Sequence, residues 1–249
     1  MTLPPTPALE RLPWPGIQRA LARDPRLILA VGALEQAGPH LPLGTNFHIA
    51  QAVADRAAAE TGVLRAPGFI YGVRLNGSRS FAGTSGLSRK TLHRTINELL
   101  AAWEDHGVRE FILVTGHRSE PHLEALLMAL TSNARTSVFD LATIDVDDIL
   151  QGEAGLEHGG ERETALLLHL FPELVSREEI RDVEPSRATV SSYRRGHPPT
   201  PPTSARGVAG YPSRATAEAG AAVFRRYVET LTSWLGAGTP HRDERYQAP

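Results

Sequence analysis

Short apolar runs alternate with amphipathic segments along most of the chain. The runs at 26–34 and 110–115 are typical of buried strands, the first covered on both faces, and 63–70 and 137–144 are two further predicted strands. Between and around them, apolar residues recur at helical spacing; the predicted helices cover 16–23, 47–60, 89–106, 121–133, 160–171 and 216–235. Strands that alternate with helices predict an α/β fold, a single three-layer domain with one mostly parallel sheet flanked by helices.

Local signals mark several helix ends. Ser88 is a preferred N-cap, and Gly107 suits the end of the same helix. Pro121 sits in a first helical turn, where its missing N–H costs nothing. Ser213 is the candidate cap of the last helix. Residues 183–212 include HPPTPP and have no strong period, which predicts an extended excursion over the surface or across a subunit boundary.

Length and composition exclude several kinds of partner and of catalytic site. The 249 residues suit one domain, which we place at 1–235, with a flexible tail at 236–249. The net charge of −2 gives no electrostatic footprint for nucleic acid or an anionic membrane. There are no cysteines, so thiolate metal sites and cysteine nucleophiles are excluded. No signal peptide or membrane-spanning run is evident. We therefore expect a cytoplasmic protein that acts on a small molecule.

The most informative stretch is LAVGALEQAGPHLPLGTN at 29–46. A buried strand leads to Glu35 and then to a Gly- and Pro-rich loop that carries His40. The strand at 110–115 leads in the same way to His117. Open α/β sheets place their sites at the carboxyl ends of strands, so these loops are predicted to border a functional site.

These residues resemble the motifs of the creatininase (creatinine amidohydrolase) family. The stretch at 29–46 is similar to the signature E-Q-H-G-x-H-L-P-x-x-T-D. Four further segments resemble family motifs in the same order: YG…FAGT at 71–84, TGH at 115–117, EHGGERET at 157–164 and GVAGYPSRATAEAG at 207–220. The resemblance implies a two-metal site at the carboxyl ends of the strands, in a homo-oligomer that is often a hexamer. It also implies hydrolysis of C–N bonds in cyclic or formyl amides by a metal-bridging hydroxide.

The chain departs from the family at residues that would bind metal. Ala37 stands where the signature has a metal-binding His, and Asn46 where it has a metal-bridging Asp. A neutral amide is a poor bridge between two divalent ions, which need anionic ligands to offset their repulsion. Asn46 also suits the N-cap of the helix that begins there. After His117, Arg118 and Ser119 replace two small residues, or an aromatic residue and a Glu.

The residues that remain predict at most one divalent ion. The resemblance implies metal ligation by Glu35, His117 and Glu163. Asn46 is a weaker candidate, as is His48, which lies two residues further along the chain. Three ligands can hold one Zn, Mn or Fe ion with an open water position. A site that holds no metal is the alternative.

The same loops supply candidates for catalysis and for substrate binding. Imidazoles and carboxylates are the usual general acids and bases; the catalytic candidates are His158, Glu163 and His117. The substrate-binding candidates are Arg118, Arg162 and His40. A guanidinium can hold a carboxylate or phosphate with two hydrogen bonds, or it can neutralise Glu residues that no longer bind metal. His40 can instead brace its loop through hydrogen bonds.

Three functions fit these residues. The first is a divergent amidohydrolase that uses at most one metal ion. The second is a metal-independent biosynthetic enzyme that performs cyclisation, dehydration or isomerisation by His and Glu acid–base catalysis. The third is a non-catalytic homologue that binds a small molecule or another subunit. The substrate cannot be identified from the sequence.

Overall fold

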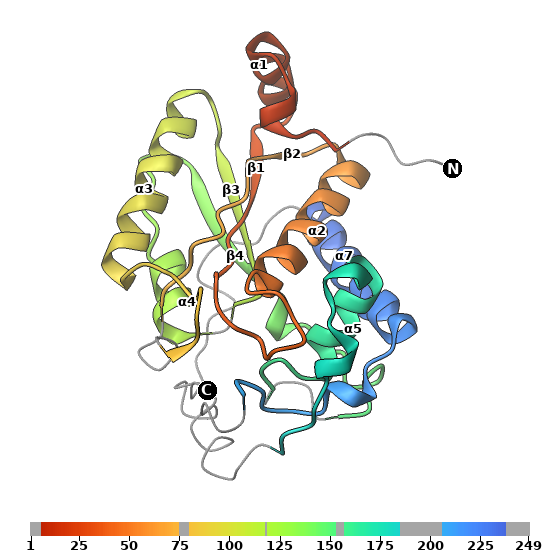
Figure 1. Cartoon of the computed structure of the whole chain (residues 1–249). Helices are drawn as coiled ribbons and strands as arrows, with labels where there is room; N and C mark the ends of the chain where they lie inside the picture. The colour runs from red at the N-terminus through yellow and green to blue at the C-terminus, as the bar shows by residue number, and fades with distance from the viewer. Residues whose placement is uncertain (1–5, 75–79, 118, 153–156, 185–205, 238–249) are drawn as a thin grey trace.

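A parallel sheet of four strands forms the centre of the described structure (Figure 1). The computed structural model describes residues 6–74, 80–117, 119–152, 157–184 and 206–237. Within these residues the strand order is β2–β1–β3–β4, and each neighbouring pair is parallel. The strands are β1 (Arg26–Ala30), β2 (Leu64–Arg65), β3 (Glu110–Thr115) and β4 (Arg135–Asp140). The predicted α/β fold is confirmed.

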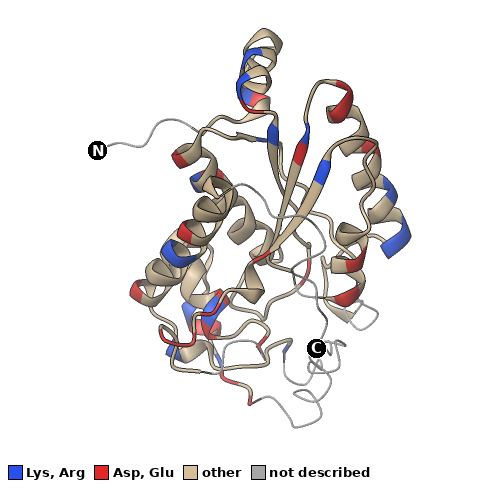
Figure 2. Ribbon diagram, turned by 180° about the vertical axis from the view of Figure 1, so that it is seen from behind, with Lys and Arg blue, Asp and Glu red and all other residues tan. Residues whose placement is uncertain are grey.

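Helices cover both faces of the sheet, which gives three layers. The helices are α1 (Trp14–Arg23), α2 (Thr45–Thr61), α3 (Arg89–Asp105), α4 (Glu120–Leu127), α5 (Glu161–Leu170) and α7 (Ala217–Gly236). In Figure 1, α3 and α4 lie on one side of the strands, and α2, α5 and α7 lie on the other. Charged residues of both signs are interspersed along the helices (Figure 2). No helix in the described part of the chain is long and apolar enough to cross a membrane.

Short 3-10 turns join several of these elements. They are η1 (Leu9–Arg11), η3 (Leu141–Thr143), η4 (Pro172–Leu174), η5 (Arg177–Glu179) and η7 (Pro212–Arg214). Of these, η3 follows β4 directly, and η4 follows α5 after a single residue.

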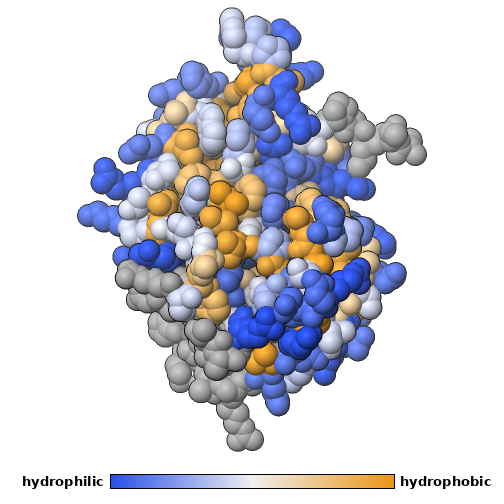
Figure 3. Space-filling view, viewed as in Figure 1, coloured by the Kyte–Doolittle hydropathy of each residue, from blue (hydrophilic) through white to orange (hydrophobic). Residues whose placement is uncertain are grey.

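The alternation of side chains along β1 explains why its sequence is apolar throughout. Ile28 and Ala30 pack into the core beneath α2, α5 and α7, whereas Leu27 and Leu29 pack against α3 and α4. Neither face of the strand meets water, so no polar residue is needed at alternate positions. On the face viewed in Figure 3, apolar side chains also gather at the surface in the middle of the molecule.

The cap predicted for α3 is confirmed, and the one predicted for α7 is wrong. Ser88 Oγ accepts a hydrogen bond from the backbone N–H of Thr91 at 3.1 Å. At α7 the cap is Thr216, whose Oγ1 accepts from a backbone N–H at 3.1 Å. Ser213 instead hydrogen-bonds to the carboxylate of Asp182, which holds it before the helix begins.

Four predicted elements extend further in the sequence pattern than in the structure. The strand predicted at 26–34 ends at Ala30, and the strand predicted at 137–144 ends at Asp140, where η3 follows. The helix predicted at 121–133 ends at Leu127, because the chain then turns back toward α3. There the carboxylate of Glu104 accepts hydrogen bonds from the backbone N–H groups of residues 132–134. The strand predicted at 63–70 is reduced to β2, with one further bridge between Val31 and Phe69.

Part of the predicted organisation lies outside the described residues. This applies to 185–205 within the predicted excursion at 183–212, and to 238–249 within the predicted tail. The helix α7 extends to Gly236, the first residue assigned to that tail. The domain at 1–235 therefore stays a prediction.

The loop that follows β1 is fastened to its neighbours by backbone and side-chain hydrogen bonds. The backbone N–H of Glu35 donates to the carbonyl of Leu43 at 2.9 Å, and that of Gln36 donates to Thr84 Oγ1 at 3.1 Å. His40 is 1% exposed, and its Nε2 shares a hydrogen bond with Thr164 Oγ1 in α5 at 2.9 Å. The loop is thereby attached both to the segment at 80–87 and to α5.

Packing between α5 and α7 depends on Gly220. A Cβ at this position would overlap the backbone carbonyl oxygen of Ala165 in α5. We expect Gly220→Ala to lower the free energy of unfolding by about 2 kcal/mol, because the helices must separate. Gly236→Ala is the matched control, since a Cβ there meets open space at the end of the same helix. Denaturant unfolding followed by circular dichroism measures both, and equal effects would contradict the close approach.

Burial of His40 predicts a loss of stability in acid. Burial lowers the pKa of His40 to about 4, and the backbone of Gly159 opposes this only in part. Between pH 6.5 and 4 the unfolded imidazole therefore binds more protons than the folded one. Its contribution is present above pH 6.5 and is lost as the pH falls through 4.

His40→Gln should therefore reduce the fall in the free energy of unfolding between pH 7 and pH 4. We expect a reduction of about 2 kcal/mol, which allows for screening by solvent. Denaturant titrations at several pH values measure this slope. His106→Gln, at an exposed position after α3, is the control. A slope that is unchanged in His40→Gln would refute the prediction.

Candidate active site

A buried ion pair lies where β1 and β3 deliver their loops to one edge of the sheet. β1 and β3 are parallel neighbours, so the residues that follow them meet at the carboxyl-end edge. Glu35 follows β1 and His117 follows β3; Oε1 of Glu35 and Nδ1 of His117 are 3.0 Å apart. Glu35 is 8% exposed and His117 is 2% exposed. The predicted placement of these two residues thus brings them into direct contact.

Each member of this pair favours the charged form of the other. Burial alone would raise the pKa of Glu35, but the charge and hydrogen bond of His117, together with His158, lower it below its ordinary value. Burial would lower the pKa of His117, yet Glu35, Glu163 and Asp140 raise it above its ordinary value. The site is therefore a hydrogen-bonded carboxylate and imidazole inside the protein, where charges interact strongly.

The imidazole of His117 is held on its other sides as well. Its Nε2 lies 3.2 Å from Ser119 Oγ, and its backbone N–H donates to Thr115 Oγ1 at 3.2 Å. The ring also packs edge-on against His122, with ring centroids 4.8 Å apart. Ser119 and His122 were not among the residues predicted for the site.

His122 is a neutral imidazole whose tautomer follows from its hydrogen bonds. The backbone N–H of Val73 donates to its Nδ1 at 3.4 Å, so Nε2 carries the proton and donates to Thr115 Oγ1 at 3.1 Å. Burial, and then the charge of His117, lower its pKa well below the ordinary value. It supports the ring of His117 without adding a second charge. Its only sequence signal was its place in the first turn of the helix after the His117 loop.

Glu163 and Asn46 form a second buried contact beside the ion pair. Glu163 Oε2 accepts from the backbone N–H of Gly159 at 2.6 Å. The amide nitrogen of Asn46 donates to Glu163 Oε1 at 2.8 Å and to the carbonyl of Gly116 at 3.2 Å. Asn46 is not the N-cap of α2, because the helix begins one residue earlier and its cap is Gly44. The amide instead links α2 and α5 to the loop after β3.

His158 lies close to Glu35 and is tied to the loop after β1. Its backbone pairs with Ala209 through two hydrogen bonds of 2.8 Å. Its Nε2 donates to the backbone carbonyl of Gln36 at 2.7 Å. Together with the pKa effects above, this shows that the structure brings Glu35, His117, His158 and Glu163 together at one edge of the sheet.

The charge of Arg162 is directed at buried carboxylates. Its Nε lies 3.6 Å from Glu157 Oε1, and its backbone N–H donates to the same oxygen at 2.9 Å. Burial would lower the pKa of Arg162, but Tyr227, Glu157 and Glu163 raise it. Burial also raises the pKa of Glu157 to about 7, against the effect of Arg162. This contact matches the second of the two interpretations from sequence, the neutralisation of Glu residues.

The remaining predicted residues either make no contact with the ion pair or lie outside the described residues. The ring of His48 packs against Phe171, with centroids 5.4 Å apart, and burial lowers its pKa. No hydrogen bond or ring contact of the described residues joins His48 to the ion pair. His40 fastens the loop after β1 to α5. Arg118 lies outside the described residues.

The donor atoms do not fit the two-metal centre implied by the resemblance. Among the described residues, no group of three His, Asp or Glu side chains could hold a metal ion. Ala37 is buried and presents only a methyl group, and Asn46 directs its amide N–H groups at Glu163. Glu35 and His117 use their facing atoms on each other. Anionic ligands that could bridge two ions are therefore absent from these positions.

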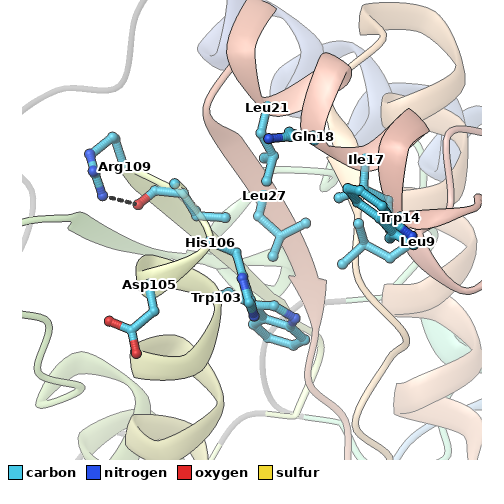
Figure 4. Close-up of a pocket in the computed structure, with 12 residues that line it drawn as sticks. Leu9, Trp14, Ile17, Gln18, Leu21, Leu27, Trp103, Asp105, His106 and Arg109 are labelled. Atoms are coloured by element: carbon cyan, nitrogen blue, oxygen red, sulfur yellow. Dashed lines mark hydrogen bonds between the residues drawn. The ribbon is translucent and has the colours of Figure 1, made fainter.

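Two cavities among the described residues differ in their position relative to this edge. A hollow of about 20 Å³ touches the site and is lined in part by Asn46, Gly116 and Glu163. A cavity of about 800 Å³ lies beside the start of β1 and before β3, at the opposite end of the strands. Figure 4 shows it lined mainly by apolar and aromatic side chains such as Trp14 and Trp103. It therefore does not share the acid–base residues of the ion pair.

Comparison with known proteins identifies the family. A family model described as creatinine amidohydrolase matches residues 10–235. Creatinine amidohydrolase of Pseudomonas putida is 30% identical over 189 residues, which cover 68% of this chain and 73% of that protein. Mycofactocin precursor peptide peptidase of Mycobacterium ulcerans is 30% identical over 235 residues, or 88% of each chain.

Solved structures agree with the sequence comparison. A crystal structure of creatinine amidohydrolase has a TM-score of 0.79 and 25% identity, and covers 94% of this chain and 98% of that chain. Creatininase has also been solved in an Mn form and as a mutant of Zn–Zn type. The Zn–Zn mutant has a TM-score of 0.77 and 25% identity, and covers 94% of this chain and 99% of that chain. From its sequence, its fold and these relatives, the chain belongs to the creatininase family.

Proposed function

We propose that this protein hydrolyses the C–N bond of a small cyclic or formyl amide, with the buried pair of Glu35 and His117 as its general base. The observation that carries the proposal is the 3.0 Å contact between Nδ1 and Oε1 at the carboxyl-end edge of the sheet. The class of bond is supported by the relatives, one named an amidohydrolase and another a peptide peptidase. The proton transfers of the reaction are assigned to residues of this chain.

The ion pair has the orientation that a general base requires. Glu35 holds the Nδ1–H of His117, so once the ring has lost its second proton Nε2 is the proton acceptor. When Nε2 takes a proton from the attacking group, Glu35 and Glu163 stabilise the imidazolium that forms. The same Nε2–H can then protonate the leaving nitrogen. Burial strengthens these interactions because few water molecules screen them.

Metal use separates this proposal from the divergent one-metal hydrolase. The Mn and Zn–Zn forms of creatininase support divalent metals in the family. In this chain Ala37 offers no ligand atom and Asn46 offers only a neutral amide, so the site does not fit two ions and we derive no step through a metal. The alternative is one ion on Glu35, His117 and Glu163, and it makes the opposite prediction about bound metal.

We expect protein purified without chelator to hold less than about 0.1 equivalent of Zn, Mn or Fe, because the site lacks a complete set of donors. Hydrolysis of creatinine and of a panel of formyl and cyclic amides should survive dialysis against EDTA. Mass spectrometry of the metals and a turnover assay measure the two quantities. One equivalent of metal, with activity lost to EDTA and restored by that metal, would favour the one-metal hydrolase.

His117→Gln should lower turnover by about 10³-fold, because it removes the proton acceptor. Glu35→Gln should lower it by about 10²-fold or more, since the ring loses its fixed tautomer. The exposed His106→Gln is the control, and circular dichroism verifies folding. Unchanged turnover in His117→Gln would refute the proposal. A folded protein that binds amides and hydrolyses none of them would instead favour a non-catalytic homologue.

A further inference from the structure

We infer that Ser119 is the nucleophile of this site, and that Ser119, His117 and Glu35 act as a serine–histidine–glutamate triad. Ser119 Oγ lies 3.2 Å from His117 Nε2, and His117 Nδ1 lies 3.0 Å from Glu35 Oε1. Hydroxyl, imidazole and carboxylate thus follow one another in the order that serine hydrolases of unrelated folds use. The inference rests on the proposed function, because it names the atom that attacks the amide.

The hydroxyl of Ser119 contacts His117, although a serine at this position would usually cap the helix. Ser119 is the N-cap residue of α4, where a serine side chain usually accepts a hydrogen bond from the first turn. Here the side chain makes no such bond. The backbone is nevertheless fixed, since the carbonyl of Ser119 accepts from His122 and Leu123 at 3.0 and 2.9 Å. The oxygen is therefore positioned by the helix, within hydrogen-bond distance of His117 Nε2.

The surroundings of Ser119 favour a negatively charged oxygen. The N-terminus of α4 carries the positive end of the helix dipole, which stabilises an anion that develops near it. His117 is held in plane by Glu35 on one side and by the edge contact with His122 on the other. A nucleophile and a base that are held before the substrate arrives lose little entropy in the reaction.

The departures from the family motif and the hydroxyl of Ser119 fall in the same site. Ala37 and Asn46 stand at two ligand positions of the motif, and Glu35 accepts a hydrogen bond from His117. Ser119 stands where the family motif has a small residue or a Glu. His117 therefore contacts a carboxylate through one ring nitrogen and a hydroxyl through the other.

The reaction balances with water as the only co-reactant. Ser119 Oγ attacks the amide carbonyl carbon, its proton passes to His117 Nε2, and the carbonyl electron pair moves onto oxygen. When the tetrahedral intermediate collapses, the C–N bond breaks and Nε2–H protonates the leaving nitrogen, which leaves an ester on Ser119. Water then attacks this ester, gives a proton to Nε2, and releases the acid as the proton returns to Ser119.

A fluorophosphonate probe tests the nucleophile without knowledge of the natural substrate. We expect intact-mass and peptide analysis to find one phosphonyl group on Ser119 of the native protein. Ser119→Ala should abolish this label, and His117→Gln should slow labelling by about 10³-fold. Ser88→Ala is the matched control, because Ser88 is also a helix N-cap but its hydroxyl caps α3. It should label at the native rate.

The lack of cysteine in the chain allows a second, independent test. Ser119→Cys introduces a single thiol beside His117, and Ser88→Cys introduces one at an exposed control position. We expect the thiol at 119 to react with iodoacetamide at least about 10-fold faster than the one at 88, because His117 favours the thiolate. Adding His117→Gln to Ser119→Cys should remove the difference. Since Ser119 is buried, this also tests whether a molecule of amide size reaches it.

The outcomes separate this inference from the proposed function. If Ser119→Ala hydrolyses amides at the native rate and His117→Gln does not, the ion pair activates water directly and the triad is wrong. If Ser119 stays unlabelled in folded protein, and the thiol at 119 reacts only after unfolding, the triad is also overturned. If neither His117→Gln nor Ser119→Ala changes turnover, both proposals fail.

Discussion

The hydrogen bond between Glu35 and His117 connects the two loops on which the site depends. A carboxylate and an imidazole that are buried separately would each lose hydration without compensation. As a pair at 3.0 Å they stabilise each other's charge, and loss of either would leave an unpaired charge inside the protein. Because β1 and β3 are adjacent, the pair forms at the shared edge of the sheet, and the surrounding polar groups are arranged around it.

Much of the fold could be predicted from the sequence because its signals are local. Continuous apolar runs identified β1 and β3, and Ser88 identified the start of α3. The errors came from contacts between distant residues. The carboxylate of Glu104 ends the helix predicted at 121–133 by binding the turn at 132–134, and no residue of that turn signals it. Asp182 likewise accepts hydrogen bonds from Ser213, so Thr216 rather than Ser213 caps α7.

The candidate site was predictable only in part, for a similar reason. Glu35 and His117 follow buried strands, which places them without knowledge of their contacts. A serine at a helix start has the same sequence signal whether its hydroxyl caps the helix, as at Ser88, or faces a histidine, as at Ser119. His122 showed no signal beyond its helical position. The direction of a side chain is decided by neighbours from other elements, and it becomes visible only in three dimensions.

The buried amide of Asn46 limits which side chains this position can accept. It donates to Glu163 and to the carbonyl of Gly116, so an Asp here would place a carboxylate against two hydrogen-bond acceptors. A His at Ala37 would in turn have to fit into a packed core. Each of these substitutions toward the family signature therefore costs stability by itself. To install a two-ion centre in this chain, a designer would first have to repack the surroundings of both positions.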